Sequence, residues 1–383
     1  MRGRILVVDH STPTPDRDSG SASTFAYLRI LASAGFHITF APADRVDAGR
    51  YTRALQALGI AIAPAGKPLA DVLGTEGARC DVLLFYRAEV AERIFDLARS
   101  VAPRAKILFH PVDLHFLRLE REAALSGDAN HAAEANAMRV TELDLIRRAD
   151  ATIVVSRYES RLLADLVPHA PVHCIPILRE PPSPRAGLLG WRRFCRRFEA
   201  PRGHASRRNF VFIGGYGHRP NVDAVLWFVR EVWPVLIAKG YRDRFIIAGS
   251  AVPPEIVALA SDRIEVRGYV ADLASLFDRC RLSIAPLRYG GGIKGKIVSS
   301  LSYGVPVVAT SIATEGMNLR HGQDILIADE PEAMAEEIVT LYGDTKLRQR
   351  ISVNGLAAFH EQFSETAGAA KVLAVFDTLM AKR

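Results

Sequence analysis

The chain is poor in cysteine and lacks long apolar runs. Its four cysteines lie far apart and show no metal-ligand spacing (Cys80, Cys174, Cys195 and Cys280). We therefore expect reduced, partly buried thiols in a cytosolic protein, and neither a disulfide framework nor a zinc site. No stretch approaches the roughly 18 consecutive apolar residues of a membrane-spanning helix, and the apolar run at residues 5–8 is too short for the core of a signal peptide. The expectation is a soluble protein, or one attached at most to a membrane surface.

Two common nucleotide-binding signatures are absent as well. The sequence has no Gly-x4-Gly-Lys-Ser/Thr segment, and no Gly-x-Gly-x-x-Gly motif follows the first predicted strand. These absences disfavour a P-loop protein and a nicotinamide-dependent dehydrogenase. The residues from Asp16 to Asp18 form an Asp-x-Asp triplet, but it lies in a predicted loop and such a triplet is common by chance. We therefore predict no metal site.

Positive charge is concentrated in one segment. The formal net charge of the whole chain is +7. Residues 185–208 hold eight arginines and one acid, Glu199, and eight minus one accounts for all of it, so the other 359 residues balance to zero. The basic composition describes this segment alone, and no nucleic-acid partner is expected.

The length and the apolar pattern predict two α/β domains. A single core stops growing at about 250–300 residues, and this chain has 383 residues with an apolar content of 49%, which is ordinary for a globular protein. Short apolar runs alternate with helical patterns, such as those at 23–34 and 133–148, which predicts parallel, doubly wound sheets. Predicted strands of the first half are 5–9, 37–41, 60–63, 81–86, 106–110, 151–155 and 172–176. Those of the second half are 210–214, 245–249, 263–267, 282–286, 305–310 and 324–328.

The predicted boundaries follow from these patterns. Residues 1–180 form an N-terminal Rossmann-like domain, 181–208 a basic linker that begins with prolines, and 209–363 a C-terminal Rossmann-like domain. Residues 364–383 are predicted to form a closing helix. Two such domains would face a cleft at the carboxyl ends of their strands, where open α/β sheets bind ligands.

A glycine turn in the second half predicts an anion site. It lies in the segment Ile284 to Thr310, IAPLRYGGGIKGKIVSSLSYGVPVVAT, between a predicted strand and a predicted helix. Free backbone N–H groups and the positive end of the helix dipole would point to the same place. Lys294 and Lys296 would add two cations there. The proposed phosphate-binding turn consists of Gly290, Gly291 and Gly292, and the alternative is an ordinary turn with two solvated lysines.

Four segments in order resemble one enzyme family. They are the stretch just described, ILVVDHSTPTPDRDSGSASTFAYLRILASAGFHITF, FIGGYGHRPNVDAVLWFVREVWP, and TSIATEGM with DILIADEPEAMAEEI. They are similar to the family 4 retaining glycosyltransferases (glycosyl transferases group 1), and the resemblance covers most of the chain except about residues 45–105. It implies the GT-B fold, a nucleotide-diphosphate sugar as co-substrate, and neither a metal nor another cofactor. The terminal helix of that family crosses back to the first domain. Its members do not use the Asp-x-Asp metal motif of the other glycosyltransferase fold.

The resemblance also implies donor-binding residues. Gly214, Gly215 and Gly217 would cradle the diphosphate with Arg219 nearby, although the usual Arg and Lys pair is not matched at its spacing; the glycines could equally serve a βα turn. Many members carry two glutamates eight positions apart around the second glycine turn, where this chain has Gly291 and Ser299. Glu315 is the candidate substitute as a ribose or sugar ligand, with a structural role as the alternative.

A cluster of polar residues follows the fifth predicted strand. His110, Asp113 and His115 occur in KILFHPVDLHFLR. The resemblance implies that one of them, with His110 best placed, touches the donor sugar or the acceptor. Because a single histidine is more often a satisfied polar residue of a loop, contact is expected for at least one of the three. No general base is assigned, because the leaving diphosphate of a retaining enzyme is thought to help deprotonate the acceptor.

Two further segments have open interpretations. Ser19 and Gly20 precede a predicted helix at 21–34, and they either contact the diphosphate or acceptor, or simply cap that helix. In GLLGWRRFCRRFEA (187–200), aromatics fall at helical spacing opposite arginines, which suits an anionic membrane surface. The alternative for this segment is a linker helix packed between the domains.

The sequence therefore predicts a cytoplasmic, metal-independent glycosyltransferase, peripheral at most on the inner membrane face. It would move a sugar from a nucleotide diphosphate to a glycan or lipid-linked saccharide in surface polysaccharide synthesis, with retention implied by the resemblance alone. One alternative is a nucleotide-sugar 2-epimerase of the same fold, which would need an acid–base pair of carboxylates. The other is a catalytically degenerate binding subunit, for which the missing glutamates are the main argument.

Overall fold

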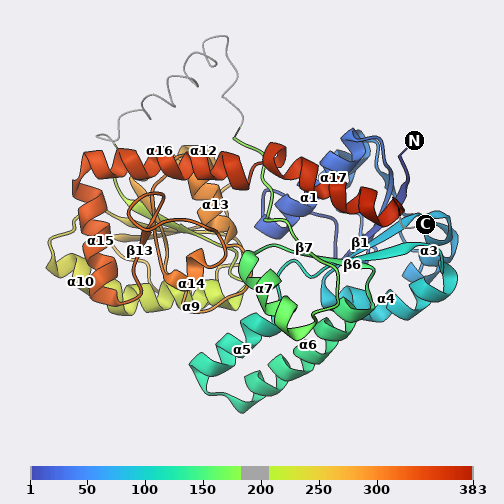
Figure 1. Ribbon diagram of the computed structural model, residues 1–383. Coiled ribbons are helices and arrows are strands. Elements are labelled where there is room, and N and C mark those ends of the chain that lie inside the picture. The colour runs from blue at the N-terminus through green and yellow to red at the C-terminus, as the bar shows by residue number, and fades with distance from the viewer. Residues whose placement is uncertain (1, 183–206, 382–383) are drawn as a thin grey trace, which may run out of the picture.

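The computed structural model describes residues 2–182 and 207–381, which are divided between two parallel-sheet domains (Figure 1). The predicted basic helix at 187–200 lies outside the described residues. The N-terminal sheet has seven strands in the order β3-β2-β1-β4-β5-β6-β7. Their bounds are β1 Arg4–Asp9, β2 His37–Pro42, β3 Ala61–Ile62, β4 Val82–Tyr86, β5 Lys106–His110, β6 Ala151–Val154 and β7 Val172–Cys174.

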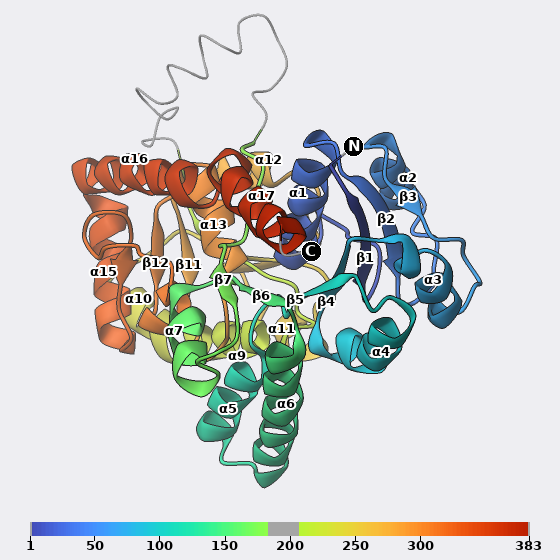
Figure 2. The same cartoon turned by 45° about the vertical axis from the view of Figure 1, so that its right-hand side comes forward.

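Helices cover both faces of this sheet. They are α1 Ser19–Ser33, α2 Arg50–Ala57, α3 Leu69–Thr75, α4 Ala88–Val101, α5 His115–Ser126, α6 Ala129–Arg148 and α7 Arg157–Leu166, with a short 3₁₀ turn at Gly77–Arg79. The α5–α6 hairpin projects away from the sheet in Figure 2. Ile5 and Val7 belong to the core on one face of the sheet, and Leu6 and Val8 to the core on the other. Burial on both faces explains why the strands read as continuous apolar runs.

The C-terminal sheet repeats the design with six parallel strands in the order β10-β9-β8-β11-β12-β13. The strands are β8 Phe210–Ile213, β9 Phe245–Ala248, β10 Ile264–Gly268, β11 Leu282–Ala285, β12 Val307–Ala309 and β13 Leu326–Ile327. The helices are α9 Arg219–Trp227, α10 Trp233–Ala238, α11 Pro254–Val257, α12 Leu273–Phe277, α13 Gly295–Ser302, α14 Ser311–Thr314, α15 Pro331–Gly343, α16 Thr345–Gln362 and α17 Glu365–Ala381, with a π-helical turn at Phe228–Val232. Every predicted strand overlaps an observed one, so the predicted α/β architecture is confirmed.

The last helix returns to the first domain. α17 packs along α1 (Figure 1), and Val372, Val375 and Phe376 join the N-terminal core. Gly368, near the start of α17, lies against Leu178. Leu178 belongs to the segment after β7, where the chain leaves the N-terminal domain. The two domains are therefore connected by two separate packed segments, which limits how they move relative to each other.

The cysteines that the structure describes are free thiols. Cys80 and Cys174 are partly buried free thiols and Cys280 is a buried one, whereas Cys195 lies outside the described residues. Burial raises the pKa of the Cys80 and Cys280 thiols to about 12, which keeps them protonated and unreactive. Among the residues that the structure describes, no helix is both long and apolar enough to cross a membrane.

Changing Gly368 to alanine tests the docking of α17. An added Cβ would overlap the side chain of Leu178, and overpacking of this kind costs about 1–3 kcal/mol. We expect Gly368→Ala to lower the melting temperature by roughly 2–4 °C per kcal/mol in thermal unfolding monitored by circular dichroism.

The matched control is Gly74→Ala, because Gly74 is also helical and a Cβ there would meet nothing within 4 Å. This control should be neutral or stabilising by about 0.5–1 kcal/mol, as alanine is favoured over glycine in a helix. Equal melting temperatures for the two variants would contradict the packing described for α17.

Candidate functional site

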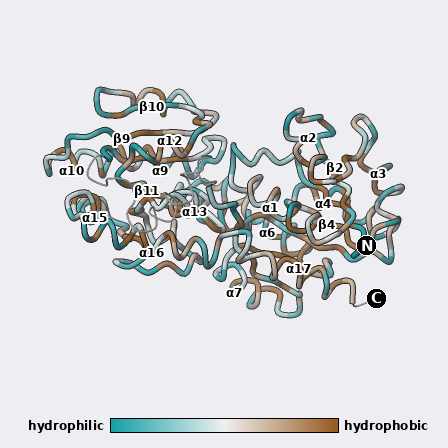
Figure 3. Tube along the Cα trace, turned by 90° about the horizontal axis from the view of Figure 1, so that it is seen from above, coloured by the Kyte–Doolittle hydropathy of each residue, from teal (hydrophilic) through white to brown (hydrophobic). Residues whose placement is uncertain are grey.

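A cavity of about 470 Å³ lies between the two domains. Its lining comes from loops at the carboxyl ends of β1, β4 and β5 on one side and of β8, β9, β10 and β11 on the other. In both sheets the strand order reverses beside the first strand, between β1 and β4 and between β8 and β11. Ligands of open α/β sheets bind at such switch points. Viewed from above, α1 and α13 meet at the junction of the domains (Figure 3).

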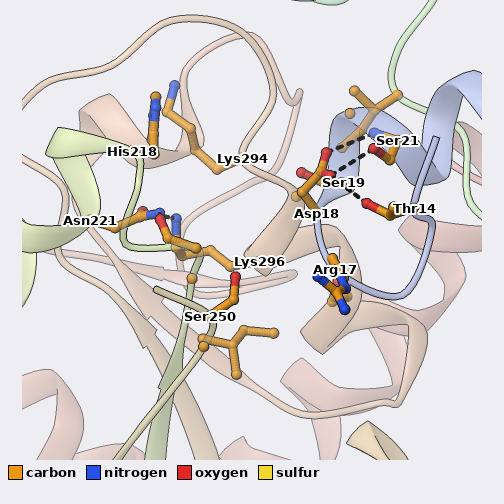
Figure 4. Close-up of a pocket in the computed structure, with 18 of the residues that line it drawn as sticks. Thr14, Arg17, Asp18, Ser19, Ser21, His218, Asn221, Ser250, Lys294 and Lys296 are labelled. Atoms are coloured by element: carbon orange, nitrogen blue, oxygen red, sulfur yellow. Dashed lines mark hydrogen bonds between the residues drawn. The ribbon is translucent and has the colours of Figure 1, made fainter. Parts of the chain in front are cut away.

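The first turn of α1 enters the cavity from the N-terminal domain. The helix begins at Ser19, two residues earlier than predicted, because the Asp18 carboxylate caps it by accepting the Ser21 N–H at 2.7 Å. Ser19 and Gly20 are therefore in the first turn and not before it, and both line the cavity. Figure 4 shows Asp18, Ser19 and Ser21 on the side opposite Lys294 and Lys296.

The first turn of α13 meets α1 directly. Gly295 opens α13, and a Cβ on this glycine would overlap both Cβ and Oγ of Ser19. A rotamer change of Ser19 would move Oγ but not Cβ, so only glycine fits while the domains stand this close. Two helix N-termini, each with free N–H groups and a partial positive charge, consequently face one space.

Two lysines line the same space. Lys294 is buried and its ammonium donates to the carbonyls of Gly291 and Gly292 at 2.9 and 2.8 Å. Lys296 donates to Asn221 Oδ1 at 2.8 Å. Burial lowers the pKa of Lys294 to about 8, against the opposing attraction of Glu315. Burial, and secondarily the charge of Lys294, lowers the pKa of Lys296 to about 7. An anion in the cavity would stabilise the protonated form of both lysines.

The glycine loop after β8 completes this wall. Gly214 and Gly215 line the cavity, whereas Gly217 and Arg219 do not. Asn221, from the first turn of α9, donates its amide N–H to the Gly215 carbonyl at 2.7 Å. A Cβ on Gly214 would lie 2.9 Å from the Asn221 side chain, so glycine is required there.

Cations of the N-terminal domain also reach the cavity. Arg87, just after β4, and Arg17, in the loop after β1, both line it. The buried Asp9 carboxylate accepts Arg87 Nε–H at 3.0 Å and so holds that guanidinium in place. The guanidinium of Arg17 lies 5.9 Å from the ring centre of Tyr269, which belongs to the other domain.

The loop after β5 is fixed by buried acceptors. His110 is buried, stacked on Tyr86, and its Nδ1 accepts the Val112 N–H at 3.0 Å. Burial, with the nearby charge of Arg87, lowers the pKa of His110 to about 3, so the ring stays neutral and keeps this acceptor. His110 does not line the cavity, but Val112 does, with a φ of 77° that is strained for a β-branched residue.

Two carboxylates from neighbouring helices hold the rest of this loop. Glu142 of α6 accepts the N–H groups of His115 and Phe116 at 3.0 and 2.9 Å. Glu159 of α7 accepts the Leu114 N–H at 3.0 Å. Burial raises the pKa of Glu142 to about 7 in spite of the opposing attraction of His115. The start of α5 is therefore positioned before any ligand arrives.

This frame presents Asp113 to the cavity. Asp113 is the member of the predicted His110, Asp113 and His115 cluster that lines it. His115 Nε2 lies 3.3 Å from Asp113 Oδ1, and Arg118 Nε lies 3.6 Å from Oδ2. Burial alone would raise the pKa of Asp113, but His115 and Arg118 outweigh it and hold that pKa well below its usual range. Asp113 is thus an ionised acceptor beside the second glycine turn, where a Cβ on Gly291 would lie 3.1 Å from Oδ2.

Glu315 and Arg219 each contact a side chain of α5. Nη2 of Arg121, from α5, donates to both carboxylate oxygens of Glu315, at 2.8 and 2.9 Å. Arg121 also donates to the Gly290 carbonyl at 2.6 Å. Arg219 Nε lies 3.1 Å from Glu122 Oε1, again across the domain boundary. Neither Glu315 nor Arg219 lines the cavity, and both instead join α5 to the C-terminal domain.

The remaining predicted residues are divided in the same way. Gly291, Lys294, Lys296 and Ser299 line the cavity, and Gly290, Gly292 and His115 do not. Asp16 lines it but accepts the Tyr269 hydroxyl at 2.7 Å and pairs with Arg50 at 2.6 Å. Within 2–182 and 207–381, no group of three or more potential metal ligands is gathered.

Several lining residues were not predicted from the sequence. His218 and Asn221 lie in the quoted segment FIGGYGHRPNVDAV, but nothing in their spacing distinguishes them from helix-start residues. Arg17 and Arg87 follow strands β1 and β4, which was a usable signal, since ligands gather at the carboxyl ends of strands. Arg179, Ser250 and Tyr269 also line the cavity.

Comparison with known proteins places these features in a family context. Residues 207–344, just over a third of the chain, match the model of the glycosyl transferases group 1 family. A 44.6 kDa uncharacterised protein of the cps region of Klebsiella pneumoniae is 24% identical over 164 residues, which are 40% of this chain and 42% of that protein. The match therefore spans less than half the length of that relative.

Solved structures match over nearly the whole chain. HepE from Anabaena, in complex with UDP and glucose, has a TM-score of 0.71 at 16% identity over 98% of this chain and 100% of its own. Sucrose-phosphate synthase from Thermosynechococcus elongatus has a TM-score of 0.75 at 14% identity over 99% of this chain and 100% of its own. Together with the two sheets, these likenesses establish the GT-B fold.

Changing Gly295 to alanine tests the contact between the two helix starts. The added Cβ would overlap Ser19, so the closed arrangement should lose about 1–3 kcal/mol relative to an opened one. We expect Gly295→Ala to increase the radius of gyration measured by small-angle X-ray scattering.

The double variant Ser19→Gly/Gly295→Ala supplies the control, because it removes the atoms that the new Cβ would meet. It should restore the compact scattering profile, while Ser19→Gly alone should leave that profile unchanged. A profile of Gly295→Ala identical to that of the unaltered protein would contradict this contact.

Proposed function

We propose that this protein is a glycosyltransferase that moves a sugar from a nucleotide-diphosphate donor to a glycan or lipid-linked saccharide in surface polysaccharide synthesis. The observation that carries the proposal is the meeting of two helix N-termini with Lys294 and Lys296 at one interdomain cavity. The family match of the second domain and the origin of the Klebsiella relative in a cps region support the enzyme class and the role.

A uridine nucleotide is the first donor to test. HepE, which shares the fold, was solved in complex with UDP-glucose, with UDP, and with UDP and glucose. The cavity here is large enough to take a nucleotide, since sites for small ligands are typically about 300–1,000 Å³. No metal and no further cofactor is part of the proposal.

The diphosphate would be stabilised by fixed cations and dipoles. Charge develops on the leaving diphosphate as the bond to the sugar breaks, and preorganised N–H groups and ammonium groups lower the energy of that charge. Gly295 and Ser19 bring the two helix starts together only when the domains are close. Closure would also exclude water, which otherwise intercepts the activated sugar.

We propose that Asp113 binds the sugar of the donor. Its carboxylate stays ionised and cannot act as an acid, but it can accept hydrogen bonds from sugar hydroxyls. It approaches the backbone at Gly291, where many members of the resembling family carry a glutamate. The carboxylate therefore reaches that place from the opposite domain.

The proposed transfer proceeds with retention at the anomeric carbon. The bond from that carbon to the diphosphate oxygen breaks, and the bond to the acceptor oxygen forms on the same face. The acceptor proton passes to an oxygen of the leaving diphosphate, so no side-chain base is required. Retention rests on the family resemblance and on no feature of the cavity.

A catalytically degenerate binding subunit is the second candidate. It is favoured by Ser299, which stands where the family has its second glutamate, and by Glu315, whose carboxylate is taken up by Arg121. No observation favours the 2-epimerase, which would need an acid–base pair of carboxylates. The cavity carboxylates Asp16, Asp18 and Asp113 are each bonded to other protein groups.

Membrane attachment stays a proposal from the sequence. Residues 187–200 lie outside the described residues, so the structure does not bear on their proposed contact with an anionic membrane surface. The same holds for the proposed cytoplasmic, peripheral location of the protein.

Isothermal titration with UDP, GDP, dTDP and CMP, followed by their sugar conjugates, tests the proposal. Binding of one nucleotide class and product formation in a radiolabelled transfer assay with membrane glycolipid extracts would support the enzyme. Tight donor binding with no turnover, either transfer or slow hydrolysis of the donor, would favour the degenerate subunit. If none of the nucleotides binds, both the enzyme and the degenerate subunit are ruled out.

Replacing Asp113 by asparagine separates the sugar site from the nucleotide site. Because a hydrogen bond to a charged acceptor is worth about 1.5–3 kcal/mol against about 1 for a neutral one, we expect Asp113→Asn to reduce kcat/KM of transfer by roughly tenfold. The affinity for free UDP should stay within about twofold, since UDP carries no sugar. A matching loss of UDP affinity would place Asp113 at the nucleotide instead.

A further inference from the structure

Lys296 is held by a neutral partner. Its ammonium donates to Asn221 Oδ1 at 2.8 Å and lies 5.2 Å from the ring centre of Phe212. Within the part of the chain that the structure describes, no carboxylate lies within ion-pairing distance of it. An ammonium has three N–H donors, and these two contacts engage at most two of them. At least one donor remains for a ligand in the cavity.

The orientation of Asn221 is fixed from both ends. The side chain is buried, its amide N–H donates to the Gly215 carbonyl at 2.7 Å, and its oxygen therefore faces Lys296. The Asn221 amide can pack against Gly214 only because this glycine has no Cβ. One side chain thus connects the glycine loop after β8 to the first turn of α13, and both of these backbone segments line the cavity (Figure 4).

We propose that Asn221 is a positioning residue that aims an uncompensated Lys296 ammonium at the diphosphate of the donor. This inference rests on the proposed function and names the group that orients its principal cation. A carboxylate at position 221 would cancel the charge of Lys296 and would lose the N–H donated to the Gly215 carbonyl. An amide keeps that bond, holds Lys296 and leaves its charge for the ligand.

The charged surroundings of Lys296 support this role. The ionisable group acting on the pKa of Lys296 is Lys294, at the start of the same helix. Burial lowers the pKa of His218, at the cap of α9, to about 4, so that imidazole is neutral near pH 7. The nearest side chain of β8 is the uncharged Phe212. Burial among these groups lowers the pKa of Lys296 to about 7, so the empty site loses its proton near neutral pH.

A pH dependence of donor binding follows from this arrangement. An anion beside Lys296 raises its pKa, so binding above neutral pH takes up a proton. The cation is fully present below the pKa of the empty site and is lost as the pH rises through that value. Affinity should therefore be flat at acidic pH and fall by roughly tenfold per pH unit above the empty-site pKa, until the pKa of the complex is reached.

Titration calorimetry with UDP-glucose at pH 6.5, 7.5 and 8.5 tests the proposal. This ligand is suitable because its diphosphate has no terminal phosphate group, which would itself titrate near pH 6. Each pH is measured in two buffers of different ionisation enthalpy, which reports proton uptake directly. For the unaltered protein we expect affinity to fall at least tenfold across this range, with uptake of about one proton or more at pH 8.5, because Lys294 adds to the effect of Lys296.

Three variants assign the effect. Lys296→Met should bind weakly and lose the pH dependence between pH 6.5 and 7.5, leaving only the fall near pH 8 and the proton uptake that Lys294 contributes. Asn221→Asp, which keeps the shape, should bind at least tenfold more weakly at pH 6.5 and shift the fall in affinity to higher pH. Asn221→Leu should weaken binding at every pH. The matched control is Asn354→Asp on α16, whose amide donates to the Gln323 carbonyl, and it should behave as the unaltered protein.

Outcomes that overturn the proposal differ from those that overturn the function. Unchanged affinity in Asn221→Asp, or an unchanged fall in affinity between pH 6.5 and 7.5 in Lys296→Met, would remove Asn221 and Lys296 from the proposed roles. If UDP-glucose does not bind at all, the donor assignment fails, and nuclear magnetic resonance titration of the ligand-free lysine Nζ signals decides instead. The signal absent from Lys296→Met should titrate near pH 7 and move upward by more than one unit in Asn221→Asp, and equal titration in both proteins would refute the orienting role.

Discussion

The arrangement of the cavity depends on the contact between Gly295 and Ser19. Without a side chain at Gly295, the first turn of α13 reaches the first turn of α1, and the free N–H groups of both helices face one space. Arg121 and Glu315 bridge the same two domains from α5. Because α17 also ties the C-terminal domain to α1, the closed form is held on opposite sides of the cleft.

Charged groups of both signs line the cavity. On the C-terminal side, Lys294 and Lys296 are cations whose pKa is lowered to about 8 and about 7, so they gain from an anion. On the N-terminal side, Asp113 is kept ionised by His115 and Arg118. A ligand with a diphosphate beside the two lysines and hydroxyl groups beside Asp113 would match these charges. The loop that carries Asp113 is preorganised, which reduces the entropy lost when a ligand binds.

The sequence was sufficient to predict the strands and the glycine turn, and insufficient to predict the pairings between domains. Strands buried on both faces are continuous apolar runs, so both sheets could be predicted from local pattern. Lys294 and Lys296 were predicted from a strand–glycine–helix sequence, whereas Ser299 was singled out only by the family resemblance. Arg121 and Glu315 are 194 positions apart, and no local signal pairs them. His110 resembled a ligand in sequence, yet it accepts a backbone N–H in the core.

The central claim is that a diphosphate binds between the starts of α1 and α13. A crystal structure of the protein with UDP tests this most directly. We expect phosphate oxygens within hydrogen-bonding distance of Lys296 Nζ and of the backbone N–H groups that open the two helices. Density for UDP at any other place, or an empty cavity in crystals soaked at saturating UDP, would contradict it.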